Sequence, residues 1–280
     1  MNAPTRPLLR WHGGKWILAP WIISHFPAHK VYVEPFGGAA SVLVRKPRSY
    51  AEIYNDMDGE VVNLFRVVRC NGAALGEALS ATPFARSEFV LSYEPSSDPL
   101  EQARRTVVRS FMGFGSNSHN KATGFRANSN RSGTTPAGDW RNYPRCLGDL
   151  IDRLRGVVIE QRDAMDVCAA HDTPETLHYL DPPYVAATRD AGDDYRFEMT
   201  DEDHRAMAKA THSLQGFVCV SGYRSDLYDD LFSDWECREK DSLADGARPR
   251  REALWLNRRC FEALEAGPLF ARRTQEGRDT

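Results

Sequence analysis

The chain has 280 residues, with 36 lysines and arginines against 39 aspartates and glutamates, so its formal net charge is −3. This near-neutral balance excludes a simple polycation, and the 41% hydrophobic and 27% charged fractions exclude a disordered tail or a fibrous repeat. The length fits one large globular domain or two small ones.

Nothing in the sequence predicts membrane insertion, secretion or metal binding. The apolar run at residues 16–23 is interrupted by Pro20 and is far shorter than the roughly 20 residues that span a bilayer. No signal peptide precedes it. The six cysteines lie far apart without a CxxC pair, and none of the eight histidines has HExxH spacing. We therefore expect a cytoplasmic protein with reduced thiols, no bound metal and no membrane contact.

Short β-branched and aromatic runs recur along the chain, and they alternate with polar or helical stretches. The first run ends in Gly37 and Gly38, after which helical spacing begins at Val42. Helical spacing also follows the second run, over residues 61–75. The runs predicted to be strands are residues 31–36, 52–56, 157–161, 178–181, 216–221 and 252–257. Strands that alternate with helices predict an α/β fold with a mainly parallel sheet.

The middle of the chain has a different pattern. Residues 66–154 are helical in spacing at both ends, with a glycine, asparagine and serine stretch at 113–138 that contains no long apolar run. Loops longer than about 15 residues are uncommon inside compact domains. We therefore predict an inserted subdomain at residues 66–154, within a catalytic domain formed by residues 1–65 and 155–280.

The most informative stretch for chemistry is Leu180-Asp181-Pro182-Pro183-Tyr184. It follows an apolar strand, which places Asp181 at the carboxyl end of the sheet, where open α/β folds bind ligands. The two prolines stiffen the loop and allow the Pro182 carbonyl to face a substrate. The alternative is a stiff turn after a core strand, with Asp181 as a cap.

An acidic oxygen, a carbonyl oxygen and an aromatic ring suit one particular reaction. An exocyclic amine on an aromatic ring is a poor nucleophile because its lone pair is delocalised. Acceptors at Asp181 and Pro182 would localise that lone pair, while Tyr184 stacks on the base. A base in a duplex must be flipped out of the helix to reach such a pocket.

With these residues in view, the sequence resembles the Dam-type DNA adenine-N6 methyltransferases, the class alpha DPPY enzymes of bacteria and phages. Segments similar to other family motifs follow in the expected order at residues 10–15 (RWHGGK), 34–38 (EPFGG), 54–56 (YND), 161–164 (QRDA), 221–223 (SGY) and 252–257 (EALWLN). The resemblance implies a Rossmann-like S-adenosylmethionine-dependent methyltransferase fold with an antiparallel last strand. It also implies that the inserted, mostly helical subdomain recognises the target.

The resemblance implies S-adenosyl-L-methionine as the methyl donor, without a metal. The residues that match the cofactor motifs are Trp11, Lys15, Phe36, Gly37, Gly38, Asp56, Asp163, Ala164 and Asp181. The glycine motif lacks a full GxGxxG, which argues against a nicotinamide or flavin site.

Each of these roles has a structural alternative. Asp56 would bind the cofactor ribose, or it could cap the next helix, a role that Asp58 could also fill. Asp163 would bind the cofactor adenine, with the Ala164 backbone N–H beside it, or it could be a turn residue.

The N-terminal motif and the segment after the DPPY loop are open to two interpretations as well. Lys15 and Trp11 would close over the methionine end, or they could be a surface lysine and a core tryptophan. Family members commonly carry tyrosine where Trp11 stands. Residues 221–223 would line the target pocket or form a turn. Tyr195 would contact the flipped base or its neighbours, or it could have a structural role only.

The charge is unevenly distributed along the chain. Residues 101–162 contain 11 lysines and arginines against five acids, a net of +6, whereas residues 181–203 contain eight acids against two arginines, a net of −6. Phosphate contacts supply affinity, and arginine or asparagine at base edges supplies sequence choice. The residues predicted to contact DNA are Arg109, Asn117, Arg126, Asn128, Arg131 and Tyr195.

Residues 124–133 occupy the place of the family's target-recognition hairpin, and a solvated polar loop is the alternative. Their letters depart from those of GATC readers, so GATC is a hypothesis only. Salt-dependent DNA binding that weakens when Arg126 and Arg131 are neutralised is the corresponding expectation.

The sequence therefore predicts direct in-line methyl transfer to adenine N6 in duplex DNA. Asp181 is a poor base for a neutral amine but an adequate one once methylation makes the amine cationic. Cytosine N4, RNA adenine and a protein glutamine amide are alternative substrates. A DNA-binding module with a degenerate cofactor pocket is the non-enzyme alternative, although Asp56, Asp181 and Tyr184 argue against it. The recognition sequence, a cognate nuclease and the choice between monomer and weak dimer stay open.

Overall fold

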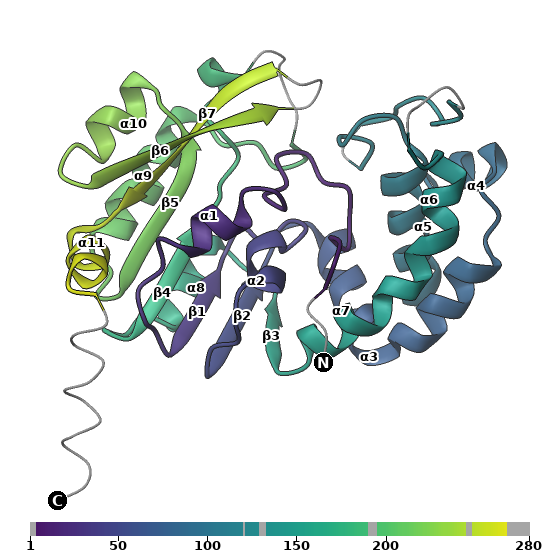
Figure 1. Ribbon diagram of the computed structural model, residues 1–280, viewed down its shortest axis with the longest axis horizontal. Coiled ribbons are helices and arrows are strands. Elements are labelled where there is room, and N and C mark those ends of the chain that lie inside the picture. The colour runs from purple at the N-terminus through teal and green to yellow at the C-terminus, as the bar shows by residue number, and fades with distance from the viewer. Residues whose placement is uncertain (1–3, 120, 129–132, 190–194, 245–247, 268–280) are drawn as a thin grey trace, which may run out of the picture.

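The computed structural model describes residues 4–119, 121–128, 133–189, 195–244 and 248–267. Within them, seven strands form one sheet in the order β3-β2-β1-β4-β5-β7-β6 (Figure 1). Their bounds are β1 Val31–Glu34, β2 Ala51–Asn55, β3 Val157–Glu160, β4 Thr176–Leu180, β5 Phe217–Tyr223, β6 Glu236–Ala244 and β7 Arg248–Leu256. The five strands from β3 to β5 are parallel, and β7 is antiparallel to both β5 and β6.

This topology confirms the predicted α/β fold, with its mainly parallel sheet and its antiparallel last strand. The structure adds β6, which was not predicted because its nine residues ECREKDSLA are mostly charged or polar. Charged side chains suit a strand at the edge of a sheet, since they discourage pairing with other chains. The antiparallel strand β7 also begins four residues before the predicted run at 252–257.

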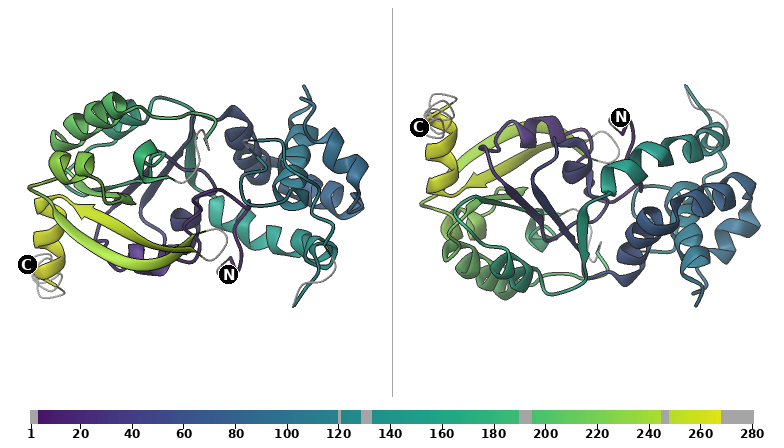
Figure 2. Two further views of the ribbon diagram at one scale, coloured as in Figure 1. Left: turned by 90° about the horizontal axis from the view of Figure 1, so that it is seen from above. Right: turned by 90° about the horizontal axis from the view of Figure 1, so that it is seen from below.

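Helices cover both faces of the sheet (Figure 2). Those outside the β2 to β3 connection are α1 Ala19–Ile23, α2 Ser41–Arg45, α8 Ala164–Ala170, α9 Asp201–His212, α10 Asp226–Leu231 and α11 Arg258–Glu265, with a 3₁₀ turn η2 at Ala186–Thr188. Successive strand residues alternate between the two cores. Tyr179 and Cys219 pack with α1, α2 and α11, whereas Leu180 and Val220 pack with α9 and α10. This period of two is expected of strands buried on both faces.

The connection between β2 and β3 is helical and lies at one end of the molecule (Figure 1). It contains α3 Gly59–Ala81, α4 Arg86–Leu91, α5 Pro99–Met112, α6 Pro136–Asn142, a 3₁₀ turn η1 Tyr143–Cys146 and α7 Leu147–Leu154. We call these elements the helical layer. Its longest helix, α3, is kinked at Asn71, whose φ of −140° is not helical.

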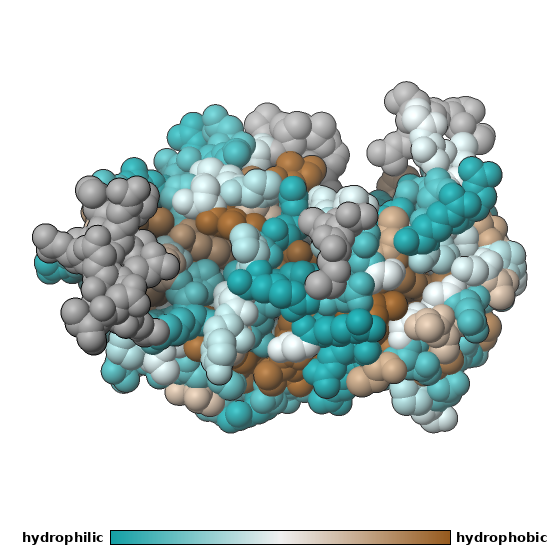
Figure 3. All heavy atoms as spheres, turned by 60° about the horizontal axis from the view of Figure 1, so that its bottom comes forward, coloured by the Kyte–Doolittle hydropathy of each residue, from teal (hydrophilic) through white to brown (hydrophobic). Residues whose placement is uncertain are grey.

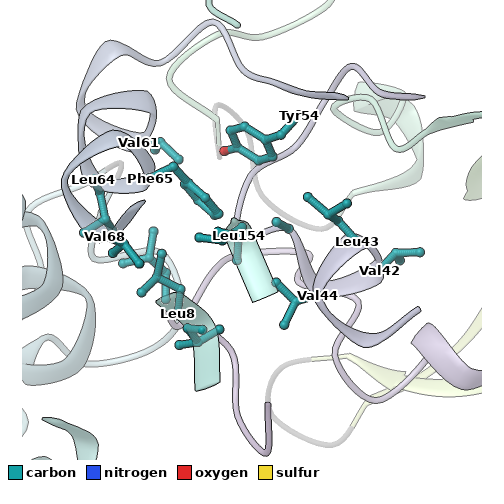
Figure 4. Close-up of a cluster of buried hydrophobic side chains, with 14 of the residues drawn as sticks. Leu8, Val42, Leu43, Val44, Tyr54, Val61, Leu64, Phe65, Val68 and Leu154 are labelled. Carbon is teal, nitrogen blue, oxygen red and sulfur yellow. The ribbon is translucent and has the colours of Figure 1, made fainter. Parts of the chain in front are cut away.

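The helical layer shares one core with the sheet. In Figure 4, Val61, Phe65 and Val68 of α3 point toward Leu154 of α7. The Phe65 ring stacks on Tyr54 of β2 with a centroid distance of 4.2 Å. The predicted boundary between residues 65 and 66 therefore falls inside α3, and the division into two units remains a prediction.

No helix in the described ranges is long and apolar enough to cross a membrane. On the face drawn in Figure 3, hydrophilic side chains predominate, and the hydrophobic patches between them are separate from one another.

Candidate active site

A cavity of about 660 Å³ lies beyond the carboxyl ends of the parallel strands. Its size is that of pockets that hold small molecules and cofactors. Segments that follow β1, β2, β3 and β4 line it together with residues 11–15. All nine residues predicted to bind the cofactor are in its wall: Trp11, Lys15, Phe36, Gly37, Gly38, Asp56, Asp163, Ala164 and Asp181. The fold thus joins motifs that lie up to 170 positions apart.

The glycine turn after β1 is shaped by two aromatic side chains. A Cβ on Gly37 would lie 2.1 Å from the Tyr54 ring, and one on Gly38 would lie 2.7 Å from Nε1 of Trp11. Gly38 also has a φ of +47°, which favours glycine. The Tyr54 hydroxyl donates a 2.8 Å hydrogen bond to the Gly38 carbonyl. These contacts bring the backbone of the turn to the cavity wall.

Asp56 is held by backbone donors. Its Oδ2 accepts a hydrogen bond from Gly38 N at 2.7 Å, and its Oδ1 accepts one from Asp58 N at 2.8 Å. Burial raises the pKa of Asp56 to about 6, although both hydrogen bonds act to lower it. The alternative role as a helix cap is wrong, because Asp58 caps α3 through Glu60 N. Each Asp56 oxygen retains a second acceptor position for a ligand.

Asp163 caps a helix and also lines the cavity. Its Oδ1 caps α8 by accepting hydrogen bonds from Met165 N at 2.9 Å and Asp166 N at 3.1 Å. The residue also lines the cavity, with buried Ala164 beside it. Among the described residues, no donor contacts its Oδ2, so that oxygen can accept from a ligand.

Asp181 and Lys15 form an ion pair in the cavity wall. Lys15 Nζ lies 3.0 Å from Asp181 Oδ1, and it donates a 2.7 Å hydrogen bond to the Gly13 carbonyl. Burial acts to lower the pKa of Lys15, but Asp181 and Glu252 outweigh it and raise that pKa above its ordinary value. Lys15 is therefore not a surface lysine. Ser221 donates a 2.7 Å hydrogen bond to the same Asp181 Oδ1, and no described donor contacts Oδ2.

Tyr184 is buried behind this pair and does not line the cavity. Its ring centroid lies 4.6 Å from Lys15 Nζ and 4.7 Å from the ring of Tyr223, which meets it edge-on. Its hydroxyl donates a 2.7 Å hydrogen bond to Oε2 of Glu252. Glu252 was not predicted as a site residue, although a lone acid that opens the apolar run ALWL was a usable signal. Pro183, and not Pro182, is the proline in the cavity wall.

The assembled motifs agree with a comparison against known families. A model of D12 class N6 adenine-specific DNA methyltransferases matches residues 11–244, which include every residue of the cavity wall. The chain belongs to this family. The methyltransferase therefore methylates N6 of adenine in DNA, as the sequence predicted, and its family implies S-adenosylmethionine as the donor.

Three named relatives align with most of the methyltransferase chain. The DNA adenine methylase of Serratia marcescens is 26% identical over 245 residues, which cover 82% of this chain and 87% of that protein. The DNA adenine methylase of Haemophilus influenzae is 25% identical over 234 residues, 75% of each chain. The type II methyltransferase M1.LlaDCHI of Lactococcus lactis subsp. cremoris is 25% identical over 252 residues, 82% of this chain and 85% of that protein.

Tyr195 lies in the cavity wall of the methyltransferase, and not on a remote surface. A Cβ on Gly13 would lie 2.9 Å from its hydroxyl, and its ring meets that of His12 at 5.5 Å. The guanidinium of Arg189 lies 5.4 Å from the Tyr195 ring centroid. Burial raises the pKa of the Tyr195 hydroxyl above its usual range. The residue therefore contacts the segment that holds Lys15.

Two arginines predicted to contact DNA are buried in the helical layer. Arg109 is 5% exposed, pairs with Glu60 and lies over the Tyr93 ring. Arg126 is 8% exposed and donates to the Phe111 carbonyl at 3.4 Å. A phosphate contact requires an accessible guanidinium, and these two side chains are buried, so we do not propose the predicted DNA contacts for them.

The other predicted DNA contacts differ in exposure. Asn128 is exposed and Asn117 is half-buried, whereas Arg131 lies outside the described residues. Of the two asparagines that the structure describes, Asn128 is therefore the more accessible to a base edge.

A polar network that the sequence did not predict joins the helical layer to the cavity. His119 Nε2 lies 2.9 Å from Asp58 Oδ2, and its ring lies 5.0 Å from that of Trp11. Arg196 donates to Asp58 Oδ1 at 3.1 Å and to Glu60 Oε1 at 3.0 Å. Burial acts to raise the pKa of Asp58, but His119 and Arg196 lower it overall. Three segments distant in sequence thus meet at the wall that contains Trp11 and Asp58.

Proposed function

We propose that the cavity binds S-adenosylmethionine and that the methyl group passes directly to N6 of an adenine flipped out of duplex DNA. One observation carries this proposal. Asp181, the acceptor for an amine, stands in the same wall as Asp56 and the glycine turn, which suit a nucleoside. A donor bound there and an amine at Asp181 would be neighbours, as direct transfer requires.

The chemistry of the cavity wall fits the cofactor. Asp56 has acceptor positions for ribose hydroxyls, and Asp163 Oδ2 can accept from an adenine amino group. Phe36, Met165 and Met207 supply apolar surface for the adenine ring. When bound, the cofactor supplies an electrophilic methyl group on its sulfonium. The chain's own residues orient the two reactants and exclude water.

Asp181 and Pro182 are the residues we assign to the target amine. Asp181 Oδ2 and the Pro182 carbonyl would accept its two N–H groups and localise its lone pair. After transfer the amine is cationic, and the Asp181 carboxylate can take its proton. Tyr184 is buried with its ring facing Lys15 Nζ, so stacking on a flipped base would require the Lys15 side chain to move.

Product analysis tests this proposal. The protein is incubated with methyl-labelled S-adenosylmethionine in three separate reactions. One contains unmethylated duplex DNA, one contains RNA and one contains a glutamine-containing peptide. We expect label only in duplex DNA, recovered as N6-methyladenine after digestion to nucleosides. Label in N4-methylcytosine, RNA or peptide would contradict the substrate assignment. Mapping the labelled adenines gives the recognition sequence and tests the GATC hypothesis.

A further inference from the structure

The cavity lies at the carboxyl ends of the parallel strands, and we call this end of the sheet the catalytic edge. The β6–β7 hairpin extends past it. β5 ends at Tyr223, which pairs with Glu252, but β7 begins four residues earlier at Arg248. At roughly 3.3 Å per residue, the hairpin projects about 13 Å beyond β5. It projects on the side where Asp181 follows β4, because β4 and β5 are parallel. Figure 1 shows the start of β7 on the same side of the molecule as the segment between α5 and α6.

Two adjacent arginines of the hairpin lie on opposite faces. Side chains alternate along a strand, so Arg250 shares the face of Glu252 and of Tyr223, which pairs with Glu252. The Arg250 guanidinium lies 6.0 Å from the Tyr223 ring centroid. Arg251 is on the other face, where its Nε lies 3.1 Å from Asp241 Oδ1.

The face that carries Arg250 leads to the catalytic loop. Tyr223 meets Tyr184 edge-on at 4.7 Å, and Glu252 accepts the hydrogen bond of the Tyr184 hydroxyl. The ring of Tyr223 therefore lies between Arg250 and Tyr184. Arg250 is near the start of β7, in the part of the hairpin that projects past β5. Its half-buried side chain lies at the rim of the region that would receive a flipped base.

The two arginines between the catalytic loop and α9 already have acidic partners. Arg189 pairs with Glu198, and Arg196 pairs with Asp58 and Glu60. When a base enters the pocket, its flanking phosphates stay at the rim, so a cation that binds them there would come from another segment. A guanidinium at the rim can bind a phosphate through two parallel hydrogen bonds.

We propose that Arg250 binds a backbone phosphate beside the flipped adenine, and that Arg251 does not. This inference rests on the proposed function, because it needs a base in the pocket behind Tyr184. The contact between Arg250 and Tyr223 would keep the guanidinium oriented before DNA arrives. Arg250 would thereby favour the extrahelical position of the target nucleotide, and the hairpin would be a second DNA contact apart from the helical layer.

Three variants test the inference: Arg250→Gln, Arg250→Lys and the matched control Arg251→Gln. For each, we measure methyl transfer to unmethylated duplex DNA and the KM values for DNA and for S-adenosylmethionine. The dissociation constant for the same duplex is measured across a salt series. Loss of one phosphate contact lowers the slope of log affinity against log salt by about 0.9.

We expect Arg250→Gln to raise the KM for DNA about tenfold and to reduce the salt slope by about one contact, with the KM for S-adenosylmethionine unchanged. Arg250→Lys should restore the salt slope, because it keeps the charge, and Arg251→Gln should resemble the wild type. An unchanged slope in Arg250→Gln, or equal losses in both glutamine variants, would overturn the inference. A lower kcat with an unchanged salt slope would also overturn it. That pattern would mean that Arg250 only positions the Tyr223 ring and does not contact a phosphate.

The two proposals fail in different ways. Wild-type protein that transfers no methyl group to duplex DNA would overturn the proposed function and this inference with it. Normal transfer by the wild type, with no change in the salt slope of Arg250→Gln, would overturn the inference alone.

Discussion

The catalytic edge of the sheet and the helical layer use charged side chains differently. At the catalytic edge, Asp56 and Asp181 have ordered partners but keep acceptor positions toward the cavity. In the helical layer, Arg104 pairs with Glu88 and Glu101, and Arg109 pairs with Glu60. The net charge of +6 at residues 101–162 therefore overstates what DNA would meet. The net charge of a segment therefore indicates little about function until the partners of each charged group are known.

The largest expected effect lies at the catalytic edge. Asp181→Ala removes the proposed acceptor for the amine, so we expect kcat to fall about 10³-fold, with S-adenosylmethionine affinity changed only a few-fold. Labelled methyl transfer and calorimetric titration measure the two quantities. Asp234→Ala, an exposed aspartate elsewhere, is the control and should keep full activity. A kcat within tenfold of the wild type would remove Asp181 from the mechanism.

The next largest effect is one of stability and belongs to the helical layer. Arg109→Ala would remove the buried partner of Glu60 and leave it paired with the exposed Arg196 alone, so we expect a loss of about 2 kcal/mol in the free energy of unfolding. Denaturant unfolding measures it, with the exposed Arg141→Ala as a control that stays within about 0.5 kcal/mol. The folded fraction should bind DNA with the wild-type salt slope. A reduced slope without a stability loss would instead make Arg109 a phosphate contact.

A smaller effect is expected at Asp56, on the cofactor side of the catalytic edge, where the KM for S-adenosylmethionine should depend on pH. The pKa of Asp56 is raised to about 6, so its carboxylate is ionised above that pH and takes up a proton below it. Because ribose hydroxyls would donate to the ionised form, the KM for S-adenosylmethionine should rise as pH falls through about 6. Asp56→Asn should raise that KM roughly tenfold and abolish this rise. Steady-state kinetics from pH 5 to 8 would reveal either outcome.

The smallest effect is expected at the exposed part of the segment between α5 and α6. Asn128→Ala should leave the unfolding temperature unchanged, because the side chain is exposed. It should alter, by a few-fold, the preference between the mapped site and duplexes with one base changed. Competition assays with the two duplexes measure that ratio. An unchanged preference would move sequence recognition away from Asn128.

Most of the sheet and of the cavity wall could be predicted because their signals are local. A strand followed by glycine, proline or an acid is visible within a few residues, as in residues 31–38 and 180–184. The network of His119, Asp58 and Arg196 could not be predicted in this way, because its members come from three distant segments. No run of neighbouring residues encodes such pairs.

The burial of Arg109 had a weak signal in the sequence, which the count of charges over residues 101–162 concealed. On α5, Thr106 and Arg109 follow the helical spacing of the buried face and lie beside apolar Val107 and Val108. A charged residue on such a stripe indicates a buried pair, but its partner Glu60 is 49 positions away. The opposite error occurred for β6, whose charged residues concealed an edge strand.

The neighbouring places of β1 and β4 in the sheet have a consequence for how the enzyme is made. Lys30 and Glu175 flank this pairing and are 145 positions apart, with the whole helical layer between them. Contacts of such long range form slowly, and an emerging chain can complete them only after the later strand has left the ribosome. The pair of Lys15 and Asp181 is therefore among the last features to assemble. A mutation that merely delays docking of α3 or α7 would extend the time for which the unpaired β1 edge is exposed to aggregation.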